Sequence, residues 1–332
     1  MIMIMKKIVG LLALFVLIIH SVQAQYDAQF SQNMFMLSAH NPAMMSLDGR
    51  ANVLGLNRQQ WAGWKDGEPN GSSRPKTTTP ATTVFEFAMP FTIGKVKNVG
   101  GILFFDDKAG LFANRSVYLQ YAYKRNVWEG MLAGGVNLGF INASFDGSKA
   151  YIPESDYHVK EDPLVPQTDE SAFKFDMALG LAYYDAKKYA GISVMHVSAP
   201  KMDIGEKWSM SINPLLNFTA GYNILLPNPL YEIKPSVFFK TDFISWQVDV
   251  NGIIEYKKLF FGGLSYRFQD AVVVMVGLKV LNGLQVSYSY DITTSKMGYS
   301  SVGGKGSHEI LASYSFNIER TKRNKVKSVR IL

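Results

Sequence analysis

His196 and Ser198 have the residue types and the spacing that acyl-transfer chemistry needs. Two residues apart on a β-strand they share one face, where an imidazole can activate a serine hydroxyl, as in a lipase or deacylase. The other histidines are widely scattered, and the sequence lacks HExxH, a phosphate-binding glycine loop and a recurrent Asp-x-Asp calcium loop. We therefore predict that the chain is not an enzyme and holds no cofactor and no metal.

The composition excludes further kinds of chemistry. Because the chain contains no cysteine, it cannot form a disulfide, a thiolate metal site, a cysteine nucleophile or a lipoprotein anchor. Lys and Arg exceed Asp and Glu by 34 to 27, but the excess is not gathered into an internal basic patch, so nucleic acid is not an expected partner. With 47% hydrophobic residues, the chain is too apolar to be disordered as a whole.

Residues 1–24 have the layout of a secretory signal peptide. Lys6 and Lys7 precede the apolar run 8–19, and small residues follow at the positions that a signal peptidase reads. We predict that this peptide is removed and that the mature chain begins near Gln25. Beyond it no apolar run approaches the roughly 20 residues that a membrane-spanning helix needs, so none is expected.

The rest of the sequence alternates apolar and polar residues with a period of two, which is typical of β-strands. The segments 173–184, 246–256 and 284–291 show it clearly, and Gly, Tyr, Val and Thr dominate where a helix would favour Ala, Glu and Lys. We predict about fourteen strands, with ends uncertain by a few residues. They are expected at 51–61, 80–91, 99–106, 111–124, 129–141, 173–185, 189–197, 212–226, 231–242, 244–256, 258–268, 271–281, 283–294 and 307–317.

The lengths of the connections distinguish a soluble sandwich from an outer-membrane barrel. If the N-terminus is periplasmic, connections after odd-numbered strands point outwards, and these include the longest ones, 62–79, 142–172, 198–211 and 295–306. Outer-membrane barrels have short periplasmic turns and long surface loops, whereas a sandwich has no reason to sort its loops in this way. We therefore predict an all-β fold, a transmembrane antiparallel up-and-down β-barrel over residues 51–318, located in the outer membrane with both termini periplasmic.

Charged residues of both signs fall on the polar face of these strands, which is expected to line the lumen. They either pair with one another across a polar interior or grip a ligand or polypeptide, for which a barrel of this size has room. The lumen candidates are Asp176, Lys240, Asp249, Glu255, Arg267 and Asp291, together with Glu86, Lys174 and Glu309.

The short turns carry an excess of basic residues. Such residues suit contact with anionic headgroups of outer-membrane lipids, although turns are also often lysine-rich for solubility alone. The basic turn residues are Lys95, Lys97, Arg125, Lys187, Lys188, Lys257 and Lys258.

Four segments of the mature chain carry recognisable motifs. Residues 29–46 read QFSQNMFMLSAHNPAMMS, in which an aromatic-Ser-Gln, a Met-Phe and an Asn-Pro-Ala follow one another. RQQWAG stands at 58–63 and YRFQDA at 266–271, and the run 288–316 contains YSYDITTSK, SHEI and SYSF. In this order, and over nearly the whole mature chain, these motifs resemble the PorP/SprF family of type IX secretion membrane proteins.

The resemblance implies an outer-membrane barrel of type IX secretion or gliding-motility systems. It implies that the barrel binds the C-terminal domain of a secreted surface protein, such as an adhesin, and supports its export or surface anchoring. Periplasmic components of the secretion system are further implied partners. The chain departs from the family where the Gly after Asn-Pro-Ala is replaced around 44–46, and where 65–79 is enlarged and rich in Lys and Thr.

Within such a barrel, Trp61 and Trp64 are the candidate cargo-binding residues, because aromatic side chains flanked by polar loops make good interface anchors. Their alternative role is in the aromatic girdle at the membrane interface. Residues 25–50 are expected either to plug the lumen or to lie beneath the barrel as a periplasmic contact. The basic tail 319–332 is expected to be a solvated extension, or to touch phospholipid or the secretion machinery.

A second function stays open at this point. The balanced polar interior also suits a passive channel or a small-solute transporter of the outer membrane. The binding function is favoured by the family resemblance and by the weight of sequence in the outward connections.

Overall fold

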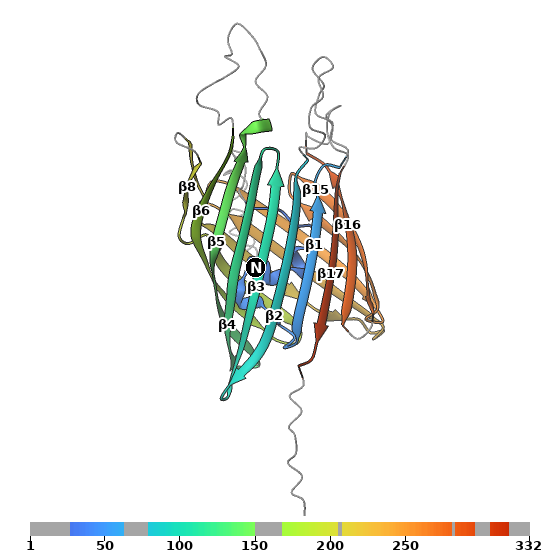
Figure 1. Ribbon diagram of the computed structural model, residues 1–332. Coiled ribbons are helices and arrows are strands. Elements are labelled where there is room, and N and C mark those ends of the chain that lie inside the picture. The colour runs from blue at the N-terminus through green and yellow to red at the C-terminus, as the bar shows by residue number, and fades with distance from the viewer. Residues whose placement is uncertain are drawn as a thin grey trace, which may run out of the picture.

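A computed structural model describes residues 27–62, 79–149, 168–204, 208–280, 283–295 and 306–318. In these ranges the chain forms a closed antiparallel barrel with fourteen wall strands (Figure 1). Strands that follow one another pair around the wall, and the pairing of β1 with β17 joins its two ends. The predicted all-β, up-and-down barrel is therefore confirmed. Within the described residues, no helix is long and apolar enough to cross a membrane.

Every predicted wall strand is present. The strands are β1 (Ala51–Gln59), β2 (Ala81–Ile93), β3 (Val96–Ala109), β4 (Phe112–Val127), β5 (Gly130–Asp146), β6 (Asp169–Tyr184), β7 (Lys188–Met195), β10 (Leu215–Tyr222) with its continuation β11 (Ile224–Leu225), β12 (Tyr231–Thr241), β13 (Trp246–Tyr256), β14 (Phe260–Arg267), β15 (Ala271–Val280), β16 (Leu284–Thr293) and β17 (Ser307–Phe316). β10 and β11 form one wall position, because both pair with β12. β5 and β6 run further than predicted and shorten the connection expected at 142–172.

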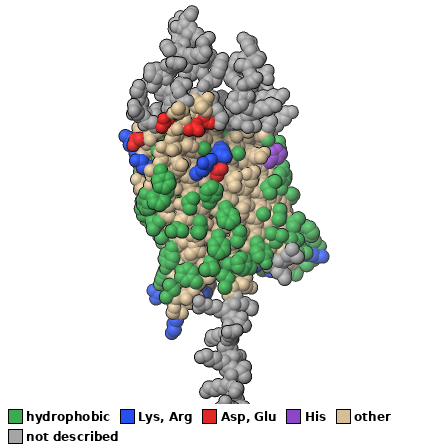
Figure 2. Space-filling model, in the orientation of Figure 1, with side chains coloured by type: hydrophobic (Ala, Val, Ile, Leu, Met, Phe, Trp, Pro, Cys, Tyr) green, Lys and Arg blue, Asp and Glu red, His purple; other side chains and the backbone are tan. Residues whose placement is uncertain are grey.

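Each wall strand faces two environments, which explains the period of two. On β4, Tyr118 and Gln120 point inwards and are 2% and 3% exposed, whereas the outward Leu119 is 65% exposed. Figure 2 shows hydrophobic side chains gathered over the middle of the wall and charged ones near its rims. An apolar outer band flanked by polar rims is what a barrel presents to lipid.

The connections at the two ends of the barrel differ in length. Short turns join β2 to β3, β4 to β5, β6 to β7, β11 to β12, β13 to β14 and β15 to β16, and we call this the short-turn end. The longest connections, after β1, β5, β7 and β16, lie at the other end, which we call the long-connection end.

One of the long connections is not the loop that the sequence predicts. β8 (Lys201–Ile204) and β9 (Trp208–Ser211) pair with each other inside the segment 198–211 and form a separate two-stranded hairpin. Both strands alternate, as KMDI and WSMS, but four residues are the shortest stretch over which alternation indicates a strand, so the segment was expected to be a loop.

Residues 27–50, here called the plug, lie inside the barrel rather than beneath it (Figure 1). The plug contains three short helical pieces, η1 (Asn33–Phe35), α2 (Leu37–His40) and η2 (Pro42–Met44). It descends from the long-connection half of the lumen to the start of β1 at the short-turn end. Met36, Ala43 and Met45 of the plug are fully buried.

The plug turn Asn41–Ala43 fits against inward-facing glycines of three adjacent strands. A Cβ added to Gly135 on β5 would lie 2.3 Å from the backbone nitrogen of Ala43. A Cβ on Gly180 of β6 would lie 2.0 Å from Asn41 Oδ1, and one on Gly191 of β7 would lie 2.8 Å from Asn41 Nδ2. Glycine is therefore required here for close approach of the plug to the wall.

The Asn41 side chain also bonds to the wall backbone. Its Nδ2 donates to the carbonyl oxygens of Leu181 at 3.0 Å and Ile192 at 3.1 Å, while its Oδ1 accepts from the N–H of Ala43 at 2.9 Å. Asn41 thus ties the turn to both β6 and β7 and closes the turn on itself.

We expect Gly135→Val to displace the plug while leaving the wall paired, because the new side chain would overlap plug backbone rather than a flexible side chain. Overpacking of this kind destabilises by about 1–3 kcal/mol. The expected readouts are a lower thermal unfolding midpoint and faster hydrogen exchange of the plug amides. Gly252→Ala, where an added Cβ meets nothing within 4 Å, is the matched control. Unchanged exchange in Gly135→Val would show that this contact does not seat the plug.

Candidate functional site

Five charged side chains from five wall strands meet inside the lumen. Arg58 of β1, Asp249 of β13, Arg267 of β14, Asp291 of β16 and Glu309 of β17 are each at most 2% exposed. The period of two turns each of them inwards, and the closed wall brings strands that are distant in sequence to the same side of the lumen.

These side chains alternate in sign along a row. Arg58 bridges Glu309 at 3.1 Å (Nη1 to Oε2) and Asp291 at 2.7 Å (Nη2 to Oδ2). Arg267 bridges Asp291 at 3.3 Å (Nη1 to Oδ2) and Asp249 at 3.2 Å (Nε to Oδ1). The row therefore runs carboxylate, guanidinium, carboxylate, guanidinium, carboxylate, with each guanidinium between two acids. We call it the charge row.

The plug completes the charge row. The backbone N–H groups of Ser31 and Gln32 donate to the two carboxylate oxygens of Glu309 at 2.9 and 2.8 Å. The Ser31 hydroxyl donates to Asp291 Oδ1 at 2.6 Å, and Asn33 Nδ2 donates to Asp249 Oδ2 at 2.9 Å.

Three bonds run in the opposite direction. Arg267 Nη2 donates to the Phe30 carbonyl at 3.0 Å and to Ser31 Oγ at 3.4 Å, and Arg58 Nη1 donates to Ser31 Oγ at 2.7 Å. The row has one more acid than base, and the plug supplies hydrogen-bond donors to its acids. Buried charges are tolerated when they are paired and hydrogen-bonded in this manner.

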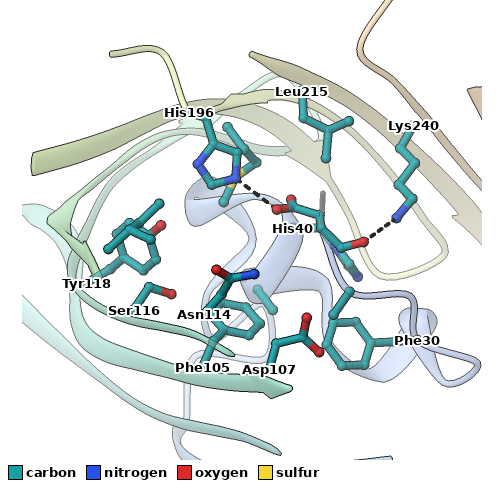
Figure 3. A pocket seen from close by; sticks show the side chains of 15 residues that line it. Phe30, His40, Phe105, Asp107, Asn114, Ser116, Tyr118, His196, Leu215 and Lys240 are labelled. Atoms are coloured by element: carbon teal, nitrogen blue, oxygen red, sulfur yellow. Dashed lines mark hydrogen bonds and ion pairs between the residues drawn. The ribbon is translucent and has the colours of Figure 1, made fainter. Parts of the chain in front are cut away.

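A cavity lies between the plug and the wall in the long-connection half of the lumen (Figure 3). Asp27, Phe30 and His40 of the plug line it, together with wall residues that include Asp107 and Lys240. Lys240 is 2% exposed, and its Nζ donates to the backbone carbonyl of Asp27 at 3.4 Å. The cavity is therefore lined by both apolar and charged side chains and lies beside the first residues of the plug.

His196 and Ser198 lie beside this cavity without forming a nucleophilic pair. The imidazole of His196 contacts two carboxylates, Asp176 Oδ2 through Nδ1 at 2.8 Å and Asp27 Oδ1 through Nε2 at 2.9 Å. Ser198 Oγ donates to Asp176 Oδ1 at 2.8 Å, and the Tyr118 hydroxyl donates to Asp176 Oδ2 at 2.8 Å. Both ring nitrogens are thus engaged by acids, and His196 acts as a clamp on the start of the plug.

Two plug residues at this cavity have shifted pKa values. Burial, aided by the nearby ammonium of Lys240, lowers the pKa of His40 to about 3, so its ring is neutral at physiological pH. Burial opposes ionisation of Asp27, but the charges of His196 and Lys240 outweigh it, and the pKa of Asp27 lies below its ordinary value. Asp27 therefore remains ionised and keeps its contact with His196.

The structure places the six lumen candidates at three locations. Asp249, Arg267 and Asp291 belong to the charge row, and Asp176 and Lys240 stand near the cavity. Glu255 lies apart on β13, where Lys234 Nζ and Lys279 Nζ approach its Oε2 at 2.8 and 2.6 Å. All six side chains are buried.

Of the two tryptophan candidates, the structure describes Trp61. Trp61 follows β1 at the long-connection end, is half-buried, and its backbone N–H donates to Ser307 Oγ at 3.2 Å. Trp64 lies outside the described residues, as do the predicted signal peptide and the tail 319–332.

Sequence reasoning missed the part that Arg58 and the plug residues Ser31 to Asn33 play in the charge row. Arg58 follows Leu54 and Leu56 on the inward face of β1. The alternation along this strand could therefore have predicted that the Arg58 side chain points into the lumen. No sequence pattern indicates which acid a plug amide will meet, because the partners are more than two hundred residues away.

The chain matches one protein family over most of its length. The family described as "Type IX secretion system membrane protein PorP/SprF" matches residues 22–314. No curated protein matches the chain.

Solved structures match more weakly. The toluene transporter TbuX of Ralstonia pickettii is 12% identical with a TM-score of 0.48, over 85% of this chain and 93% of that one. A FadL homologue of Pseudomonas aeruginosa is 10% identical with a TM-score of 0.46, over 83% and 93%. The translocator domain of the autotransporter NalP from Neisseria meningitidis is 11% identical with a TM-score of 0.42, over 86% and 95%.

The family match extends from before the plug almost to the end of β17. It includes the plug turn, Arg58 and every other member of the charge row. This chain therefore belongs to the PorP/SprF family of type IX secretion system membrane proteins and is a β-barrel of the outer membrane.

Proposed function

We propose that this barrel is a docking partner in type IX secretion or gliding motility. It binds the C-terminal domain of a secreted, adhesin-like surface protein at its long-connection end and supports export or surface anchoring of that protein. The observation that carries the proposal is a lumen occupied by an anchored plug, in a barrel whose long connections gather at one end.

The plug's contacts cross the lumen. On one side they reach β13, β14, β16 and β17 through the charge row. On the other side Ser193 of β7 donates to the His40 carbonyl, and Asn41 bonds to β6 and β7, while Ser38 donates to Glu86 of β2, next to β1. Because the plug is held on opposite sides of the wall, we favour binding of the partner protein at the mouth of the barrel over passage of a solute through the lumen.

The long-connection end supplies the material for a docking surface. Under the proposal it faces outwards, with the short-turn end and the C-terminus of the chain in the periplasm, as in other outer-membrane barrels. Trp61 stands where β1 leads into the first long connection and is the described candidate for an aromatic anchor. The proposal includes no catalytic step, in keeping with the engagement of His196 by two carboxylates.

Single cysteines test the orientation, because the natural chain contains none. Ala109→Cys, at the exposed end of β3 on the long-connection side, is expected to react with a membrane-impermeant maleimide on intact cells. Lys95→Cys, in the β2–β3 turn at the short-turn end, is expected to react only after lysis. The reverse labelling order would place the long connections in the periplasm and overturn the proposed docking geometry.

Cargo capture tests the partner. Crosslinking in intact outer membranes, mild purification and mass spectrometry should recover a near-stoichiometric secreted protein joined through its C-terminal domain. Trp61→Ala is expected to lower this recovery about tenfold, the effect of removing one aromatic anchor. Trp128→Ala, which removes a 90% exposed tryptophan at the short-turn end, is the matched control. Recovery of the barrel alone would contradict the docking proposal.

Conductance separates docking from a passive channel. In planar bilayers the wild-type protein is expected to show no sustained current, because the plug is bonded to opposite walls. A steady current whose ion selectivity changes in Asp249→Asn would instead identify the protein as a channel.

A further inference from the structure

The lipid-facing surface of the wall is hollowed where β4 to β7 pass behind the plug turn. The outward side chains that line this groove are Tyr121 and Tyr123 of β4, Val136 of β5, Leu179 and Leu181 of β6, and Ile192 and Val194 of β7. Gly134 of β5 leaves the middle of the groove open, since a Cβ added there would meet nothing nearer than Leu181 Cδ2 at 3.8 Å.

The groove is apolar and offers no strand edge. The backbones of β4 to β7 are paired on both sides in the closed wall, so a polypeptide cannot be added to the sheet here. Leu181 is 58% exposed and Ile192 is 46% exposed. An alkyl chain fits such a surface, because it requires no hydrogen bonds.

Two basic residues lie below the groove toward the short-turn end. In the ladder register, Tyr123 stands beside Gly134, and the next outward residue along β4 is Arg125. Lys188 opens β7 on the same outer face, four residues before Ile192. Among the described residues, no carboxylate oxygen lies within 4.0 Å of the Arg125 guanidinium, and the only such contact of Lys188 Nζ is Asp185 Oδ2 at 3.9 Å.

We propose that this groove binds one acidic phospholipid. An acyl chain lies along Gly134, Leu181 and Ile192, and the phosphate is recognised by Arg125 and Lys188 at the membrane interface. Guanidinium and ammonium groups attract phosphate where the sheet meets the headgroup region. Charge complementarity selects an anionic headgroup, because the cationic amine of a zwitterionic headgroup offsets this attraction. This inference concerns the outer wall and does not depend on the proposed cargo.

The groove and the plug turn share one sheet of backbone. Asn41 bonds from inside to the carbonyls of Leu181 and Ile192, whose side chains line the groove outside. Gly135 and Gly180, which receive the plug turn, also border the groove. A lipid bound outside therefore packs against the same backbone that holds the plug inside.

Native mass spectrometry of the purified protein in detergent tests the site, with phosphatidylglycerol or phosphatidylcholine added. One phosphatidylglycerol is expected to be retained. Phosphatidylcholine, in which choline offsets the phosphate charge, is expected to bind about fivefold more weakly for each of the two basic residues. Equal retention of both lipids by the wild type would overturn the proposal.

Variants separate the groove from the cations. Gly134→Leu is expected to fill the groove and abolish retention, whereas Gly262→Leu, at another lipid-facing glycine with room for a side chain, should retain phosphatidylglycerol. Arg125→Gln combined with Lys188→Gln should retain lipid but lose the preference for phosphatidylglycerol. Undiminished retention in Gly134→Leu, or an undiminished preference in the double variant, would contradict the assignment. Mobility of unheated samples on gels verifies that each variant barrel is folded.

Discussion

The charge row is the interaction on which the lumen depends. Two guanidinium groups alternate with three carboxylates at positions that are almost without solvent. Water cannot stabilise them there, so each charge relies on its neighbours and on the plug amides. Loss of Arg58 would leave Asp291 and Glu309 facing each other with less compensation. The plug is thus part of the electrostatic balance of the wall and not a separate object placed inside it.

Two different physical principles hold the two ends of the plug. Its first residues are held by charge, through the charge row and the His196 clamp. Its turn at Asn41 is held by shape, where glycines on three strands admit backbone at close range. A segment fixed in both ways gives the barrel a rigid interior. Under the proposed function, recognition of different cargoes then depends on the long connections rather than on the interior.

The sequence was informative wherever one strand meets two environments. Lipid on one side and a polar lumen on the other produce the period of two, so the wall strands and the inward direction of Asp249, Arg267 and Asp291 followed from local pattern. The pairing among these residues did not follow, because β1, β13, β14, β16 and β17 meet only after the wall has closed. The β8–β9 hairpin was not predicted, because each of its strands has only four residues and lies within a connection that was expected to be a loop. The contact of Gly135, Gly180 and Gly191 with the plug turn could not be predicted from local pattern, because the segment that these glycines receive lies far away in the sequence.

The position of the plug at the start of the chain has a consequence for assembly. The plug precedes β1, yet Ser31 and Gln32 bind residues on β16 and β17, the last strands to be made. Until β16 and β17 are in place, the amides of Ser31 and Gln32 and the guanidinium of Arg58 lack these partners. Only when β17 reaches β1 do all partners of the plug exist at once. Closure of the wall therefore completes the site that holds the first residues of the plug, whereas the plug turn has its partners on β5, β6 and β7.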